Sequence, residues 1–307
     1  MKNGTAELLR IIGAPKKYDF EHTAELVRTY DKQDYTLEVY LQKNGPDSFQ
    51  RLFVAIPKSV SAPMPCVVIP YYFPEGMLGY DPDTDEVLAD YKAVSFMDDL
   101  ARRGYAVASA DSFHLSYIGI NKEEGYKPWL DKVHHWSAAA KALLADYPEW
   151  TGLGKLIFDT SLVIDLVSSD SRIDASRIGI MGHSLGGIMS FCTGCIDKRV
   201  KVIVSSDFGM NWDRNNWHDI WYFGSRISEV KSLGLTTTDL LELAAPKPFM
   251  LFAGYYDNDE SFEMMKSASG YSDSLDNLGF INHATGHRPP ADVIEKGYQF
   301  LDKWLKK

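Results

Sequence analysis

The sequence is poor in cysteine, with only three among 307 residues. Three cysteines cannot form a disulfide framework in so long a chain, and this scarcity favours a reducing compartment. No apolar run approaches the roughly 18 residues that a membrane-spanning helix needs. The N-terminal residues also lack the apolar core of a secretory signal. We therefore expect a cytoplasmic protein that does not associate with membranes.

Positive charge is scarce as well. The chain has 32 Lys and Arg residues against 42 Asp and Glu residues, a net charge of −10. Such a surface repels phosphate backbones, so nucleic acid is not an expected partner. The sequence shows neither a phosphate-binding glycine motif nor the spacing of a zinc site, so we expect no cofactor and no metal. What remains is a globular protein that is large enough for an extensive core, with its oligomeric state open.

Apolar runs and turns predict alternating strands and helices. Residues 35–41 and 49–56 flank an Asn-Gly-Pro-Asp turn and predict an antiparallel hairpin. Further strands are expected at residues 66–69, 105–110, 177–181, 200–204, 249–253 and 279–281, and helices at residues 93–101 and 156–167, after Ser184 and after Pro290. This alternation predicts an α/β fold with a mostly parallel sheet that is covered by helices on both faces.

No shift in composition marks a domain boundary, so residues 1–307 are expected to form a single domain. Residues 1–34 form an N-terminal extension, with helical patterns at residues 6–12 and 22–30. Two segments, residues 112–153 and 208–245, do not fit the alternation and are rich in Trp and Tyr. Long connections of this kind often form lids or pocket walls, which is the role we expect for both.

The most informative motif is Gly182-His183-Ser184-Leu185-Gly186, which matches G-x-S-x-G. It stands between the strand expected at residues 177–181 and an apolar helix. The glycines are needed because the serine occupies a strained turn in which larger neighbours would collide. The motif predicts that Ser184 is a nucleophile at a helix N-terminus, where negative charge is favoured. The alternative is a glycine-rich turn with an incidental serine.

A serine nucleophile needs a base, and the base works best when a carboxylate orients it. In this architecture the chain order is Ser, acid, His. His287 lies in the loop before the final helix and is the expected base. His283, at the end of a strand, is the alternative, and it would otherwise be a packed structural side chain.

The acid is expected at the end of a strand that follows Ser184. Asp257 is the first carboxylate after the strand at residues 249–253, and we expect it to orient His287. Asp259 and Glu260 compete with it, unless they are solvated loop charges. Asp207, after the strand at residues 200–204, is a further alternative.

The sequence resembles the α/β-hydrolase superfamily in three features that follow one another in this order: the G-x-S-x-G motif at residues 182–186, the turn at residues 254–257 and the Gly286-His287 pair. Within it, the segment DASRIG at residues 174–179, the segment DKRVK at residues 197–201 and the segment PKPF at residues 246–249 are similar to the dienelactone-hydrolase and acetyl-xylan-esterase-like group. The resemblance runs from about residue 35 to the end of the chain. It implies the α/β-hydrolase fold and ester hydrolysis through a serine acyl-enzyme without a cofactor. Dienelactone hydrolases use a cysteine nucleophile, so Ser184 favours the esterases of the group.

Two backbone N–H groups are expected to form the oxyanion hole. The first is that of Leu185, the residue after the nucleophile. The second is expected from the loop after the strand at residues 66–69, which reads Pro70-Tyr71-Tyr72 where many relatives have His-Gly. Proline has no N–H, so the donor is Tyr71 or Tyr72, and we prefer Tyr71.

Aromatic side chains near the expected site are candidates for substrate binding. They are Tyr72, Trp212, Trp217 and Trp221, whose rings are suited to stack on a sugar face or an aromatic acid. The alternative is that they pack against the body of the protein.

The preferred hypothesis is a serine esterase that cleaves short-acyl carboxylic esters through a Ser-His-Asp triad, with acylated carbohydrate as a candidate substrate. One alternative is a serine peptidase of the prolyl-oligopeptidase type, which uses the same machinery. The other is a hydrolase-fold binding protein that has lost activity.

Overall fold

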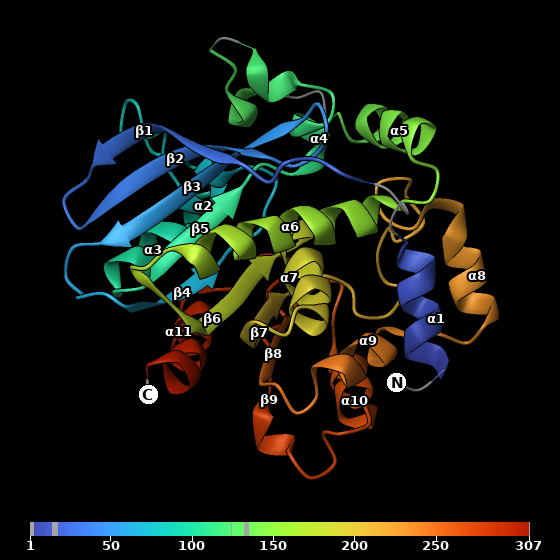
Figure 1. Cartoon of the computed structure of the whole chain (residues 1–307). Helices are drawn as coiled ribbons and strands as arrows, with labels where there is room; N and C mark the ends of the chain where they lie inside the picture. Colours follow the sequence, from blue (N-terminus) through green and yellow to red (C-terminus); the bar gives the residue numbers. More distant parts are fainter. Residues whose placement is uncertain (1–2, 14–17, 124, 132–134, 307) are drawn as a thin grey trace.

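The structure, a computed structural model, describes residues 3–13, 18–123, 125–131 and 135–306. Within these ranges the chain builds a nine-stranded sheet with the order β1-β2-β3-β5-β4-β6-β7-β8-β9 (Figure 1). The strands are β1 (Ala24–Asp31), β2 (Tyr35–Lys43), β3 (Phe49–Pro57), β4 (Met64–Val68), β5 (Ala106–Ala110), β6 (Ile173–His183), β7 (Val200–Ser206), β8 (Phe249–Ala253) and β9 (Leu278–Asn282).

The sheet is antiparallel at one end and parallel elsewhere. Strands β1, β2 and β3 pair antiparallel in chain order, and β3 pairs antiparallel with β5. From β5 through β4, β6, β7 and β8 to β9, every pairing is parallel. The expected hairpin of residues 35–41 and 49–56 is confirmed as β2–β3, and the expected mostly parallel sheet is confirmed too.

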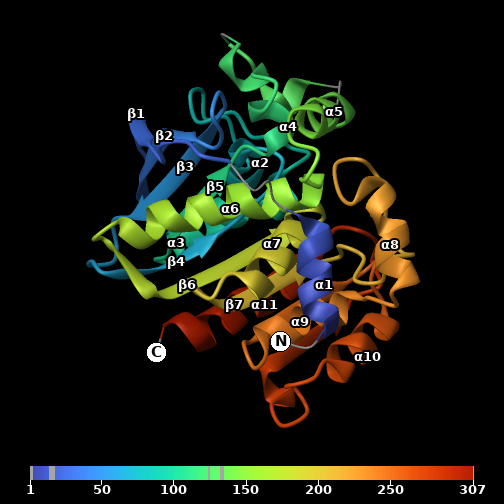
Figure 2. The same ribbon diagram turned by 45° about the vertical axis from the view of Figure 1, so that its right-hand side comes forward.

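Helices cover both faces of the sheet (Figures 1 and 2). The α-helices are α1 (Asn3–Ile12), α2 (Pro74–Leu78), α3 (Phe96–Arg102), α4 (Phe113–Ser116), α5 (Trp136–Asp146), α6 (Gly152–Ser169), α7 (Leu185–Ile196), α8 (Ile227–Ser232), α9 (Thr237–Ala244), α10 (Asp259–Ser267) and α11 (Ala291–Leu305). Short 3-10 helices are η1 (Lys92–Val94), η2 (Ile120–Lys122), η3 (Pro128–Leu130), η4 (Gly224–Arg226) and η5 (Leu275–Asn277). One buried apolar cluster includes α6 and α7, and a second on the opposite face includes α2, α3 and α11.

The N-terminal extension differs in part from the prediction. Residues 6–12 lie in a helix, α1, as expected. Residues 22–30 were expected to be helical, but residues 24–31 form strand β1. This segment pairs with β2 from Ala24↔Gln42 to Asp31↔Thr36, and the ladder supplies backbone hydrogen bonds that a short, exposed helix would have to form alone.

Helix α1 connects the two aromatic-rich segments. It lies beside α8 and α9 in both views (Figures 1 and 2). Arg226, from the segment at residues 208–245, donates to the carbonyl oxygens of Ile11 in α1 at 3.2 Å and of Glu149 in the other segment at 3.1 Å. The N-terminal extension therefore helps to hold these two segments against each other.

Cys66, Cys192 and Cys195 are free thiols in the buried core. Across the described part of the chain, none of the helices combines the length and the apolar character required to traverse a bilayer.

Candidate active site

Ser184 stands at the junction of β6 and α7, where the motif predicts a sharp turn. Its φ of 58° and ψ of −119° are strained for a residue with a side chain. Two glycines make the turn sterically possible. A Cβ on Gly182 would lie 2.1 Å from the carbonyl oxygen of Gly186, and a Cβ on Gly186 would lie 2.2 Å from that of Pro70. Because Gly186 has no Cβ, the start of α7 packs directly against the loop after β4.

The hydroxyl of Ser184 lies within hydrogen-bond distance of His287. Ser184 Oγ is 2.9 Å from His287 Nε2, and His287 Nδ1 is 2.7 Å from Asp207 Oδ2. The three side chains come from the end of β6, the end of β7 and the loop before α11. This is the geometry in which a carboxylate orients an imidazole and the imidazole receives a proton from serine.

The acid at His287 is Asp207, which corrects the expectation of Asp257. The sheet register explains the difference. In the β6–β7 ladder His183 pairs with Ser206, so the residues that follow, Ser184 and Asp207, leave the sheet side by side. Strand β8, which precedes Asp257, lies one strand further from Ser184.

Asp257 is buried and bonded elsewhere. Its carboxylate accepts the backbone N–H groups of Phe208, Gly209 and Met210 at 2.7–2.9 Å and the hydroxyl of Ser261 at 2.9 Å. Asp207 Oδ1 in turn accepts the backbone N–H groups of residues 254–257 at 2.9–3.1 Å. Each aspartate thus fixes the loop that carries the other.

The other predicted alternatives bond to groups other than His287 and Ser184. His283 Nδ1 is 2.8 Å from the Thr285 hydroxyl at the end of β9. Asp259 accepts a hydrogen bond from Asn282, and Glu260 pairs with Arg214.

Burial and hydrogen bonds set the protonation of the groups around His287. Burial tends to raise the pKa of Asp207, but the His287 bond and the backbone N–H groups outweigh it and hold that pKa below its ordinary value. His183 is buried with its ring centroid 4.5 Å from that of His287. Burial and the neighbouring His287 lower the pKa of His183 to about 3. His287 therefore lies between the ionised carboxylate of Asp207 and the neutral imidazole of His183.

The residues expected to form the oxyanion hole lie next to Ser184. Leu185 is the first residue of α7, a position at which the N–H has no acceptor within the helix. Tyr71 and Tyr72 follow Pro70, whose carbonyl group packs on Gly186. Burial raises the pKa of the Tyr72 hydroxyl, and its interaction with Ser184 partly opposes that rise.

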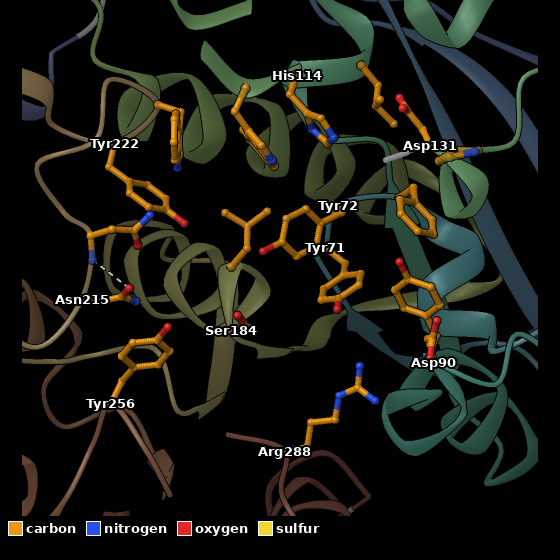
Figure 3. Close-up of a pocket in the computed structure, with 18 of the residues that line it drawn as sticks. Tyr71, Tyr72, Asp90, His114, Asp131, Ser184, Asn215, Tyr222, Tyr256 and Arg288 are labelled. Carbon is orange, nitrogen blue, oxygen red and sulfur yellow. Dashed lines mark hydrogen bonds between the residues drawn. The ribbon is translucent and has the colours of Figure 1, made fainter. Parts of the chain in front are cut away.

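Ser184 opens onto a cavity of about 960 Å³ (Figure 3). Both aromatic-rich segments contribute to its lining, the first with His114 and Trp136 and the second with Trp221 and Tyr222. The rings of His114 and Trp136 stack with their centroids 3.8 Å apart. The cavity therefore has a wall of aromatic side chains in addition to Ser184.

Of the four predicted substrate-binding residues, Tyr72 and Trp221 line this cavity. Trp212 and Trp217 do not, which corrects that part of the expectation. Both are buried, and their indole N–H groups donate to the carbonyl oxygens of Leu235 and Gly209. Both rings belong to the buried apolar cluster that includes α6 and α7, which agrees with the alternative interpretation that they pack against the body of the protein.

Sequence reasoning missed several residues of the cavity. Tyr256 presents its ring edge-on to His287 at a centroid distance of 5.1 Å. Arg288 lines the cavity directly after His287 in the chain. Arg288 could have been identified from the sequence, because it directly follows the expected base, His287. Among the residues placed by the structure, no cluster of three or more His, Cys, Asp or Glu side chains is suited to hold a metal ion.

Comparison with known sequences finds relatives among hydrolases. The family model of the prolyl oligopeptidase family matches residues 155–307, which include Ser184, Asp207 and His287. The chain is 26% identical over 305 residues to a protein of Bacillus subtilis (strain 168) named "Putative hydrolase YtaP", covering 92% of this chain and 93% of that protein.

Comparison with solved structures finds the same fold in esterases. A glucuronoyl esterase from Solibacter usitatus superposes with a TM-score of 0.73 at 14% identity, covering 98% of this chain and 92% of that one. Acetyl xylan esterase 1 from Thermoanaerobacterium sp. JW/SL YS485 superposes with a TM-score of 0.58 at 14% identity, covering 98% and 93%. These likenesses agree with the resemblance seen in the sequence, and together the comparisons support a hydrolase with the α/β-hydrolase fold.

Proposed function

We propose that this protein is a serine esterase that hydrolyses carboxylic esters, with Ser184 as nucleophile, His287 as base and Asp207 as the orienting acid. The observation that supports the proposal is the continuous pair of hydrogen bonds, 2.9 Å from Ser184 to His287 and 2.7 Å from His287 to Asp207. Dienelactone hydrolysis is not proposed, because the nucleophile is a serine.

In the proposed reaction, Ser184 Oγ attacks the ester carbonyl carbon while its proton passes to His287 Nε2. The imidazolium that forms is stabilised by Asp207, which accepts the Nδ1–H bond and stays ionised. His287 then donates the proton to the leaving alcohol, and an acyl-enzyme remains on Ser184. A water molecule, deprotonated by His287, releases the acid and restores the serine.

The negative charge of the tetrahedral intermediate needs hydrogen-bond donors. We propose the backbone N–H groups of Leu185 and Tyr71 for this role, with that of Tyr72 as the alternative second donor. One such donor contributes about 3–4 kcal/mol of transition-state stabilisation.

The proposed substrates are short-acyl esters, with acylated carbohydrate as a candidate class. The structural neighbours named as acetyl xylan and glucuronoyl esterases favour this class. The aromatic wall with Tyr72 and Trp221 supports it too, because such rings stack well on sugar faces. The cavity is large enough for a bulky alcohol component beside a small acyl group.

A second candidate is a serine peptidase of the prolyl-oligopeptidase type. The match of that family's model to residues 155–307 favours it. The same triad serves amide and ester hydrolysis, so the two functions are distinguished by measuring the rates at which the protein hydrolyses an ester and a peptide amide.

Kinetics on three substrate types test the proposal: a series of para-nitrophenyl esters of increasing acyl length, an acetylated xylo-oligosaccharide and a proline-containing peptide amide. We expect the acetyl ester to be hydrolysed faster than long-chain esters, and the Ser184→Ala variant to be inactive. Faster turnover of the peptide amide would favour the peptidase. A folded wild-type protein that hydrolyses none of them would indicate a binding protein instead.

A further inference from the structure

Arg288 has no hydrogen-bond or ion-pair partner among the residues that the structure describes. The chain contains eleven arginines. Ten of them form an ion pair or a hydrogen bond with a carboxylate or a backbone carbonyl. Between described residues, no hydrogen bond or ion pair involves Arg288. The chain has ten more acidic than basic residues, yet no described carboxylate lies within ion-pair distance of the exposed Arg288.

Arg288 lies in the cavity that holds the reactive serine. It follows His287 directly, and its guanidinium points toward Tyr71 and into the space beside Ser184 (Figure 3). The charge of Arg288 favours the ionised forms of Tyr71 and Tyr91, although burial keeps the pKa of both hydroxyls above its ordinary value. The guanidinium therefore faces hydroxyl groups and open space.

Most of the other charged side chains of the cavity have a partner within the protein. Asp131 pairs with His135 at 3.0 Å, Asp213 pairs with Lys231 at 2.5 Å and Arg214 pairs with Glu260 at 3.3 Å. Asp90 also lines the cavity but forms no ion pair with Arg288. The guanidinium thus stays available to a ligand.

A planar guanidinium presents a fork of N–H donors that matches the two oxygens of a carboxylate. We propose that Arg288 is a specificity-determining residue that binds a carboxylate on the substrate, so that the preferred esters carry a free negative charge on the acyl or the alcohol component. This inference rests on the proposed esterase function and narrows its substrate class.

Two matched pairs of esters test the inference. The first compares para-nitrophenyl hemisuccinate with its methyl ester, so that only the acyl component gains a charge. The second compares the acetyl ester of para-hydroxybenzoate with the same compound as a methyl ester, so that only the leaving group gains a charge. We expect the wild-type kcat/KM to favour the charged member of at least one pair by about 10- to 100-fold, the range of a charge-assisted bidentate contact.

The variants Arg288→Gln, Arg288→Lys and Arg214→Gln assign that preference to a residue. We expect Arg288→Gln to lower kcat/KM for the charged ester and to leave kcat/KM for the neutral ester unchanged, so that the variant no longer prefers the charged ester. Arg288→Lys should retain part of the ratio, because lysine keeps the charge but loses the fork. Arg214→Gln is the matched control, since it removes a paired arginine of the same cavity and should leave the ratio unchanged.

The inference is overturned if neither pair shows a preference, or if the preference persists in Arg288→Gln. Failure of the proposed function has a different signature. In that case wild-type protein and Ser184→Ala hydrolyse even the neutral esters at the same rate.

Discussion

Asp207 and Asp257 are chemically identical residues at the ends of neighbouring strands, yet their surroundings assign them different tasks. Asp207 uses one oxygen for the backbone of residues 254–257 and the other for His287. Asp257 uses both oxygens for backbone N–H groups and Ser261, and burial raises its pKa despite these bonds. The first is placed to act on the imidazole, and the second is placed to fix the loop that carries the first.

Exchanging each carboxylate for an amide separates these tasks. We expect Asp207→Asn to lower kcat by about 10,000-fold, because the imidazole loses the carboxylate that fixes its tautomer. Asp257→Asn should lower kcat far less but reduce thermal stability, because an amide brings N–H groups against the N–H donors of residues 208–210. Steady-state kinetics and thermal unfolding measure both effects. A larger kcat loss in Asp257→Asn than in Asp207→Asn would reverse the assignment.

The sequence predicts the nucleophile and the base at residue level but not the acid. Ser184 is marked by glycines that only a tight turn requires, and His287 by its place before the last helix. Asp207 and Asp257 both follow an apolar strand, so local sequence does not separate them. The choice depends on strand order, because β7 neighbours β6 and β8 does not. Similarly, nothing local distinguishes Trp221, which faces the cavity, from the buried Trp217.

At the scale of elements, the site depends on how closely α7 approaches the loop after β4. Gly186 is the contact point, where the Pro70 carbonyl oxygen occupies the space of a Cβ. The two proposed oxyanion donors belong to these two elements, so their separation sets how well both can reach one oxygen atom.

Gly186→Ala should therefore push the two elements apart. We expect kcat to fall by at least about 100-fold, the effect of losing one oxyanion donor, together with some loss of stability. Gly234→Ala is a control, because its φ of 66° strains any residue with a side chain while a Cβ there meets no atom within 4 Å, so the change costs stability without pushing two elements apart. A Gly186→Ala variant with wild-type kcat would show that this contact does not set the donor geometry.

Strands and helices with strong apolar patterns could be predicted, and β1 could not. The strands β4, β5, β7 and β8 are buried along their length, apart from Lys201 in β7, and appear in the sequence as short, mainly apolar runs. Strand β1 is mostly exposed, and its charged residues also suit a helix. Its conformation comes from pairing with β2. This pairing joins two segments of the chain, so the hydrophobic periodicity within one segment does not predict it.

At the scale of the whole molecule, the neutral His183 makes stability depend on pH. Its pKa is about 3 in the folded chain against an ordinary value of 6.5. Between these values the unfolded chain binds a proton that the folded chain does not, so stability rises with pH across this window and falls on acidification. Between these pKa values, a buried neutral histidine makes the free energy of unfolding rise by about 1.4 kcal/mol per pH unit.

Urea unfolding between pH 4.5 and 6.5, a range that lies between the two pKa values of His183, measures how the free energy of unfolding changes with pH. We expect His183→Gln to lose about 1 kcal/mol per pH unit of the wild-type dependence. His218→Gln, a change at an exposed histidine, is the matched control. Equal slopes in wild type and His183→Gln would mean that His183 does not remain neutral in the folded protein.

The central claim is that Ser184 is an activated nucleophile, and covalent labelling tests it most directly. The folded wild-type protein is treated with a fluorophosphonate probe, digested and analysed by mass spectrometry. We predict a single adduct on the peptide that contains Ser184, no adduct in Ser184→Ala, and much slower labelling in Asp207→Asn than in wild type. An unlabelled Ser184 in the folded wild-type protein, or an adduct that persists in Ser184→Ala, would contradict the account.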